Sequence, residues 1–92
     1  MKYFAAFLRM NDIDRNTSFR QQHIDFLQER AEEGSIFAQG RFADNSGGLV
    51  IYIAQSLEDA AKIAASDPYV VSGARVLEIH EWNMNVRTTP AS

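Results

Sequence analysis

The chain has 92 residues, a formal net charge of −3 and no cysteine, which is typical of one small globular domain without disulfides or Cys-ligated metal. Its nine Lys and Arg residues are scattered along the sequence, and this argues against a dedicated nucleic-acid or anionic-lipid binder. The first apolar run is too short for a signal-peptide core, and no run approaches the length of a membrane span. We therefore expect a soluble, cytoplasmic protein.

The first half of the chain predicts a strand, a helix and a hairpin. Residues 2–10 are mostly apolar and predict the first strand. The loop that follows offers N-caps in Asn16, Thr17 and Ser18 for a helix over SFRQQHIDFLQERAEEG, which Gly34 should stop. Strands over residues 35–43 and 49–54, joined by a DNSGG turn, should pair as an antiparallel hairpin.

The second half predicts one more helix and one more strand. Ser56, with Asp59 three residues later, is an N-cap signal for a helix over SLEDAAKIAAS. Asp67 precedes Pro68 and should end that helix, because the residue before a proline disfavours the helical conformation. Residues 69–73 then read as a short connection, and residues 74–82 alternate as a fourth strand. Residues 83–92 are expected to be a partly frayed tail.

The predicted order of elements is β-α-β-β-α-β, which indicates a single α+β domain of the ferredoxin-like type. Four antiparallel strands would carry two helices on one face and leave the other face without a cover. An exposed apolar sheet face is unusual in a monomer. We therefore expect a homodimer in which two copies pack sheet to sheet.

Three polar residues are candidates for chemistry. His23 shares a predicted helix face with Phe19, Phe26 and Leu27, so it is either a core histidine or a general acid or base, since histidine exchanges protons near neutrality. Asp44 precedes Asn-Ser-Gly-Gly and is by itself an ordinary turn residue. Asp67 has a turn or helix-stop role as its simplest reading, while His80 reads as structural or as part of an interface.

Several common sites have no signature in the sequence. There is no HxH or HExxH pair, no GxGxxG or GxxxxGK[ST] loop and no GxSxG elbow. The sequence therefore gives no support to a zinc site, a nucleotide-binding loop or a serine hydrolase. We expect no metal and no cofactor.

An ordered set of motifs resembles the YciI-like (YCII-related) family over residues 2–82. The set is HIDFL, GSIFAQGRFAD, GGLVIYIA and SLEDAAKIAASDPYVVSGA, followed by a Trp near the end of the last strand. The resemblance implies a dimeric α+β barrel. It also implies an active-site pair made by a histidine on the first helix and an aspartate after the second strand, positions that His23 and Asp44 occupy. Asp67, Pro68 and Tyr69 would border the same pocket.

One residue departs from the family pattern. Many relatives have proline where this chain has Arg41, so a cation stands near the expected pocket or on its rim. Arg41 and Arg9, at the end of the first strand, are either anion contacts or solvent-facing side chains.

Three functions are compatible with these residues, and the resemblance supports the first. Some relatives act on small ring compounds, including a dehydrochlorinase, which implies a cofactor-independent enzyme. His23 would then move a proton in an elimination or isomerisation of a small cyclic or carbonyl metabolite, and Asp44 would orient it. The alternative is a non-catalytic module that binds a small ligand or another protein, with the pair as a structural hydrogen bond. A sensor of pH or of a metabolite is a third and weaker reading.

Overall fold

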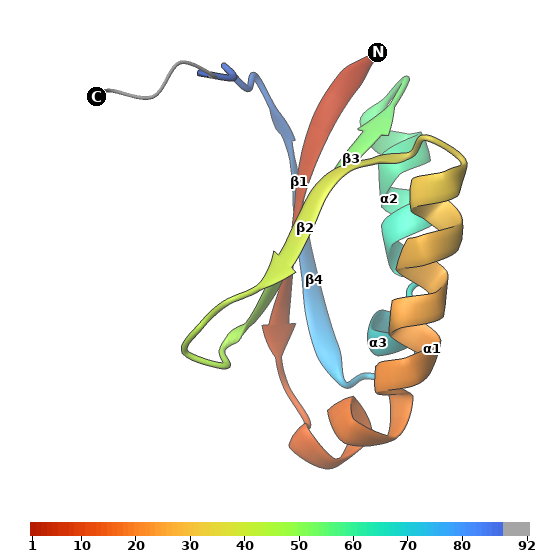
Figure 1. Cartoon of the computed structure of the whole chain (residues 1–92), viewed down its shortest axis with the longest axis vertical. Helices are drawn as coiled ribbons and strands as arrows, with labels where there is room; N and C mark the ends of the chain where they lie inside the picture. The colour runs from red at the N-terminus through yellow and green to blue at the C-terminus, as the bar shows by residue number, and fades with distance from the viewer. Residues whose placement is uncertain (88–92) are drawn as a thin grey trace.

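The computed structural model describes residues 1–87 and contains one antiparallel sheet covered by helices on one face (Figure 1). The sheet has the strand order β2-β3-β1-β4. This arrangement confirms the predicted ferredoxin-like βαββαβ order, and only one short helix was not foreseen. The elements in chain order are β1 (Lys2–Met10), α1 (Ile13–Glu32), β2 (Ile36–Arg41), β3 (Gly47–Ala54), α2 (Leu57–Ala65), α3 (Pro68–Val71) and β4 (Arg75–Trp82).

The hydrophobic core lies between the sheet and the helices. Successive side chains of a strand point to opposite faces, so every second residue of the central strands β1 and β3 faces α1 and α2. Two alanines of α2, Ala60 and Ala64, are fully buried and let this helix approach the sheet closely. The strand residues that build this core are Phe4, Ala6, Leu8, Val50, Tyr52 and Ala54.

Helix α1 begins earlier than the sequence predicted. Asp12 is its N-cap, in an extended conformation, and its carboxylate accepts a hydrogen bond from the amide of Arg15 at 3.0 Å. The predicted caps Asn16, Thr17 and Ser18 therefore lie inside the helix, which is a correction. The Thr17 hydroxyl donates back to the carbonyl of Ile13 at 3.2 Å, a bond that threonine makes inside helices.

The predicted connection after α2 contains a helical turn, α3. Asp67 accepts a hydrogen bond from the amide of Tyr69 at 2.9 Å, and Pro68 occupies the first helical position, where its missing N–H costs nothing. Asp67 and Pro68 thus end the preceding helix, as predicted, and also begin the next one. The predicted tail starts one residue after β4, and its residues 88–92 lie outside the described part of the chain.

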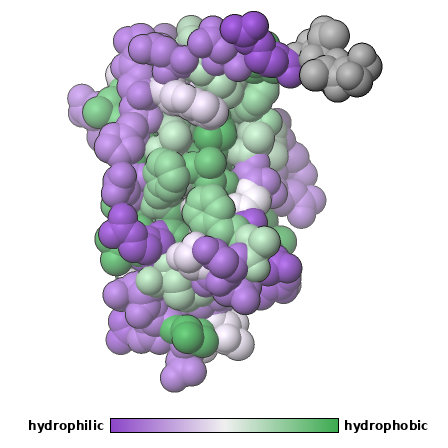
Figure 2. Space-filling model, turned by 90° about the vertical axis from the view of Figure 1, so that its left-hand side faces the viewer, coloured by the Kyte–Doolittle hydropathy of each residue, from purple (hydrophilic) through white to green (hydrophobic). Residues whose placement is uncertain are grey.

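The sheet face opposite the helices is exposed and apolar. Phe7, Phe37, Val76 and Trp82 keep 37–50% of their surface in contact with solvent. Figure 2, which looks onto this side, shows a green apolar area in the middle of the face with purple polar residues around it. The uncovered apolar face that the sequence predicted is therefore present in the single chain.

Candidate active site

His23 and Asp67 form the most buried polar pair of the described structure. Nδ1 of His23 lies 2.8 Å from both carboxylate oxygens of Asp67, whose side chain is fully buried. A carboxylate only accepts hydrogen bonds, so the proton of the imidazole is held at Nδ1. Nε2 has no hydrogen-bond partner among residues 1–87, and 12% of the His23 side chain remains exposed. The pair therefore presents Nε2 as its free nitrogen.

Tyr69 fixes the plane of the imidazole. Its ring stacks on the His23 ring with centroids 4.0 Å apart and an interplanar angle of 19°. The guanidinium of Arg75 also lies against the Tyr69 ring, with Cζ 4.3 Å from the centroid. Burial lowers the pKa of Arg75, while the nearby Tyr69 and Asp67 act in the opposite direction. One buried tyrosine thus supports both the histidine and a cation.

Asp44 does not contact His23, and the expected His23–Asp44 contact is corrected. The Asp44 side chain is exposed in the turn between β2 and β3, where it accepts a hydrogen bond from the amide of Ser46 at 2.9 Å. Hydrogen bonding by the side chain of Ser46, and after it by this amide, holds the pKa of Asp44 below its usual value. The turn lies past the ends of both strands, and the buried carboxylate at His23 comes instead from the start of α3. Asp44 therefore occupies the ordinary turn role.

A cleft of about 710 Å³ opens between α1 and the ends of β2 and β3, within the range of small-molecule sites. His23 and Tyr69 lie in its wall together with Arg41, one of the two arginines singled out in the sequence. Arg9 lies on the opposite face of the sheet, where Nη2 donates to Glu78 at 3.1 Å, so of its two expected roles an anion contact in this cleft does not apply. Pro68 is not in the wall and acts by starting α3.

Two arginines of the cleft, Arg20 and Arg75, were missed by sequence reasoning. The position of Arg75 could have been predicted. It lies two and four residues before Leu77 and Ile79, which pack against the core. The alternation of β4 therefore places Arg75 on the helix-covered face rather than in solvent. Arg20 lies three residues before His23, and residues at this spacing share a helix face.

The two glycines after the hairpin turn stand where neighbouring groups come very close. A Cβ on Gly47, where φ is +140°, would lie 2.0 Å from the carbonyl oxygen of Leu8. A Cβ on Gly48 would lie 2.8 Å from the carbonyl oxygen of Gly40 and 3.1 Å from Nη1 of Arg75. The glycines therefore permit close approach of the strands and of Arg75.

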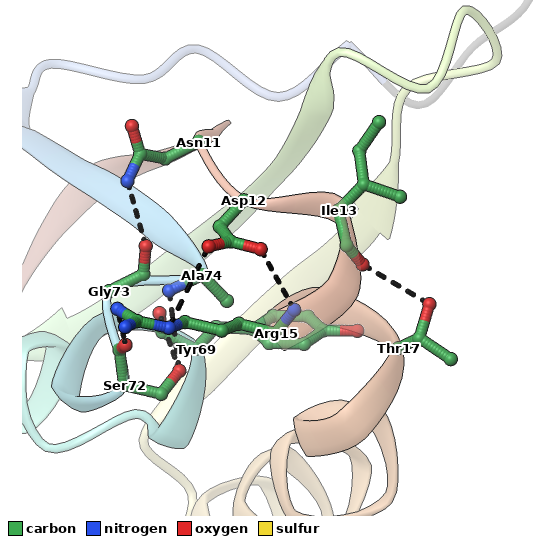
Figure 3. A network of polar contacts seen from close by, with 9 residues as sticks. All are labelled: Asn11, Asp12, Ile13, Arg15, Thr17, Tyr69, Ser72, Gly73 and Ala74. Carbon is green, nitrogen blue, oxygen red and sulfur yellow. Dashed lines mark hydrogen bonds and ion pairs between the residues drawn. The ribbon is translucent and has the colours of Figure 1, made fainter.

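A network of hydrogen bonds fixes α3 and the following loop to the start of α1 (Figure 3). Nη1 of Arg15 donates to the carbonyl of Ser72 at 3.1 Å, and Nδ2 of Asn11 donates to the carbonyl of Gly73 at 2.9 Å. The amides of Asn11 and Asp12 both donate to the carbonyl of Ala74 at 3.0 Å. Because Asp67 and Tyr69 belong to the same segment, this network sets their position relative to His23.

The potential metal ligands of residues 1–87 are dispersed. No three His, Cys, Asp or Glu side chains of this part of the chain gather where they could hold a metal ion. None of its helices is both long and apolar enough to cross a membrane.

Both the sequence and the fold resemble known proteins. The family model of the YCII-related domain matches residues 1–83. The uncharacterised protein YjpA of Bacillus subtilis (strain 168) is 38% identical over 74 residues, which cover 76% of this chain and 87% of YjpA. The structure resembles 5-chloro-2-hydroxyhydroquinone dehydrochlorinase (TftG) from Burkholderia phenoliruptrix AC1100 in complex with 2,5-dihydroxybenzoquinone. The TM-score is 0.75 with 15% identity, over 90% of this chain and 95% of TftG.

Proposed function

Because the chain belongs to the YCII-related domain family, we propose that it is a small cofactor-independent enzyme that moves a proton on a small cyclic or carbonyl compound. His23 is the acid–base group in this proposal, and Asp67, rather than Asp44, orients it. The observation that carries the proposal is the geometry of His23, whose Nδ1 is held at 2.8 Å by a buried carboxylate while its ring borders a cleft of about 710 Å³.

The chemical step follows from this geometry. Nε2 removes a proton from a carbon next to a carbonyl group, so that the C–H bond breaks and an N–H bond forms. The electron pair moves onto the carbonyl oxygen as an enolate, and Asp67 offsets the positive charge that appears on the ring. Return of the proton to another carbon completes an isomerisation, whereas departure of a leaving group completes an elimination. A positioned base of this kind contributes roughly 10²–10⁴-fold to the rate.

The fold comparison is compatible with this reaction class. TftG is by its name a dehydrochlorinase, and its structure holds 2,5-dihydroxybenzoquinone, a small ring compound that carries two carbonyl groups. At 15% identity this likeness concerns the fold, and the same fold can host different reactions. It therefore guides the choice of test compounds and does not name the substrate.

The proposal is tested by following proton exchange in a panel of small compounds. Small lactones, cyclic ketones and chlorinated hydroxyhydroquinones are incubated with the protein in D₂O, and ¹H NMR detects exchange, isomerisation or loss of chloride. His23→Ala should lose at least about a hundredfold in rate. His80→Ala is the matched control for the loss of an imidazole outside the cleft, because His80 pairs with Glu78 on the other face of the sheet. The mass of this variant in solution is compared with that of wild type, because that face is the expected interface. Equal rates in wild type and His23→Ala would rule out the proposed base.

We also propose that the protein is a homodimer joined through the exposed sheet face. The support is the apolar patch that contains Phe7, Phe37, Val76 and Trp82. Strand alternation places these residues on the face opposite the core. Light scattering after size exclusion should give twice the chain mass, and Phe7→Asp should give the monomer. Val71→Asp is the control, because Val71 is 73% exposed on α3, on the other side of the sheet. A wild-type protein that runs as a monomer at all concentrations would contradict this.

A further inference from the structure

Arg75 is a buried cation without a carboxylate partner. Only 9% of its surface is exposed, and no Asp or Glu oxygen of residues 1–87 lies within ion-pair distance of its guanidinium. Nε donates to the side-chain oxygen of Asn16 at 2.9 Å, whereas the two Nη groups donate to no acceptor in the described chain. The Nη groups are not sealed from solvent, and the cleft runs beside them, so this mostly buried cation is open to an anion that enters the cleft.

The charges around the cleft are strongly one-sided. The chain as a whole has 12 acidic and 9 basic residues, yet three arginines and no Asp or Glu are found in the cleft wall, namely Arg20, Arg41 and Arg75. Asp67 is fully buried and pairs with His23 rather than with any of these arginines. Arg20 has no ion pair within residues 1–87, and Arg41 is bound only to the neutral side chain of Asn45 at 3.1 Å. The cleft is therefore a positive region on a negatively charged protein.

We propose that Arg75 anchors a carboxylate group of the substrate, so that the enzyme acts on a small organic acid. This inference rests on the proposed function, because it assigns the substrate class of the same cleft. The two Nη groups of an arginine match the two oxygens of a carboxylate in a bidentate pair. Gly48 leaves room beside Nη1, since a Cβ there would lie 3.1 Å from this atom.

The geometry also relates the anchor to the acid–base group. His23 and Arg75 each pack on the ring of Tyr69, at 4.0 and 4.3 Å, and all three residues line the same cleft, so a ring compound that lies along the edge of Tyr69 can contact both groups. A carboxylate held by Arg75 would fix the orientation of the substrate carbon that faces Nε2 of His23. Arg20 and Arg41 lie on the exposed part of the wall and would raise the local concentration of anions without fixing their orientation.

The test measures carboxylate binding directly and does not require turnover. Sodium acetate is titrated into the protein at constant ionic strength, with acetamide as the neutral probe of the same shape, and benzoate with benzamide as a larger pair. Acetate is too small to be excluded by the shape of the cleft. The ¹⁵N–¹H resonances of Arg75 Nε and of the Gly48 amide report on the site. We expect saturable shifts with the carboxylates only, and tighter binding of benzoate because the cleft wall is partly apolar.

Variants separate the anchor from the general charge of the cleft. Arg75→Gln should weaken benzoate binding about tenfold or more, and Arg75→Lys should retain part of it. Arg87→Gln, in the exposed segment after β4, removes a charge that lies outside the cleft wall and should bind benzoate like wild type. The amide spectrum of each variant shows whether it is folded. If Arg75→Gln is unfolded, benzoate binding by Arg75→Lys decides. A partial loss of affinity supports the anchor, whereas an affinity equal to that of wild type would overturn it and leave Arg75 only a role in packing against Tyr69.

The outcomes distinguish this inference from the proposed function. Unsaturable shifts, equal shifts with acetamide, or unchanged affinity in a folded Arg75→Gln would overturn the carboxylate anchor, whatever His23 does. His23→Ala should still bind benzoate within a fewfold of wild type. Binding that depends on Arg75, together with turnover that does not depend on His23, would leave the anchor standing and overturn the proposed reaction.

Discussion

Both carboxylate oxygens of Asp67 lie 2.8 Å from Nδ1 of His23, although 44 positions separate the two residues in the chain. Asp67 also accepts a hydrogen bond from the amide of Tyr69, whose ring stacks on the imidazole. One aspartate thus starts a helix, orients a histidine and positions the aromatic ring that supports it. This arrangement predicts that Asp67 and Asp44 respond differently to substitution.

Asp67→Ala should lower the free energy of unfolding by roughly 3 kcal/mol, because it removes one partner of a buried pair together with a helix cap. Asp44→Ala should change it much less, because Asp44 is exposed and bonds only the amide of Ser46. Urea unfolding monitored by circular dichroism measures both values. A larger loss in Asp44→Ala than in Asp67→Ala would contradict the assignment of the buried pair.

The glycines of the hairpin should tolerate alanine to different degrees. Gly47→Ala should destabilise the protein by at least about 2 kcal/mol, because φ is positive and a Cβ would collide with the carbonyl of Leu8. Gly40→Ala is the matched control, since nothing lies within 4 Å of its Cβ position. It should be neutral or slightly stabilising. Thermal unfolding of the two variants checks this. Similar losses of stability in both would show that the collision with the carbonyl of Leu8 is not what makes alanine unfavourable at Gly47.

Tyr52→Phe should stabilise the protein. The Tyr52 hydroxyl is buried and has no hydrogen-bond partner among residues 1–87, and an unsatisfied buried hydroxyl is unfavourable. Burial and the nearby charge of Asp67 both raise the pKa of Tyr52, so this hydroxyl stays protonated. Removing it should add about 1 kcal/mol and raise Tm by about 4–8 °C. A lower Tm in Tyr52→Phe would show that the hydroxyl has a partner in solution, such as a buried water.

The ionisation of Glu78 should make a small contribution to stability that disappears in acid. The hydrogen bond with His80 at 2.8 Å is the main cause that lowers the pKa of Glu78, and the charges of His80 and Arg9 add to it. A pKa that is lower in the folded state favours folding above the unfolded value of about 4.5. This contribution is lost as the pH falls through the folded pKa.

Glu78→Gln tests that contribution through the pH dependence of Tm. The variant should melt below wild type between pH 5 and 6, and the difference should shrink below pH 4.5. Glu32→Gln is the control for the loss of one negative charge, because Glu32 takes part in no ion pair within residues 1–87. A difference that grows in acid would have the wrong sign for a lowered pKa.

Local signals predicted most of the fold. Ser56 caps α2 as expected, with its hydroxyl accepting from the amide of Asp59 at 3.2 Å. Alternation and apolar runs located all four strands to within a few residues. The start of α1 was missed because several capping residue types stand between Asp12 and Ser18, and only the tertiary contact with the loop before β4 selects Asp12. The amide of Asp12 bonds the carbonyl of Ala74, which no local pattern reveals.

The partner of His23 was missed for a related reason. Asp44 and Asp67 both occupy turn-like sequences, and the family resemblance favoured Asp44. The local signal for Asp67 was its place before Pro68, which is typical of an N-cap followed by a proline at the first helical position. That signal predicts α3, but its docking against α1 depends on long-range bonds such as that from Arg15 to the carbonyl of Ser72. The choice between two aspartates therefore required the three-dimensional structure.

The most direct test of the central claim is ¹⁵N NMR of the His23 ring in wild type, Asp67→Asn and Asp44→Asn. We expect the neutral ring of the wild type to carry its proton on Nδ1, as the contact with Asp67 requires. Asp67→Asn should release this tautomer, whereas Asp44→Asn should leave the ring resonances unchanged. A proton on Nε2 in the wild type, or a tautomer that responds to Asp44 and not to Asp67, would contradict the assignment of His23 and Asp67 as the acid–base pair.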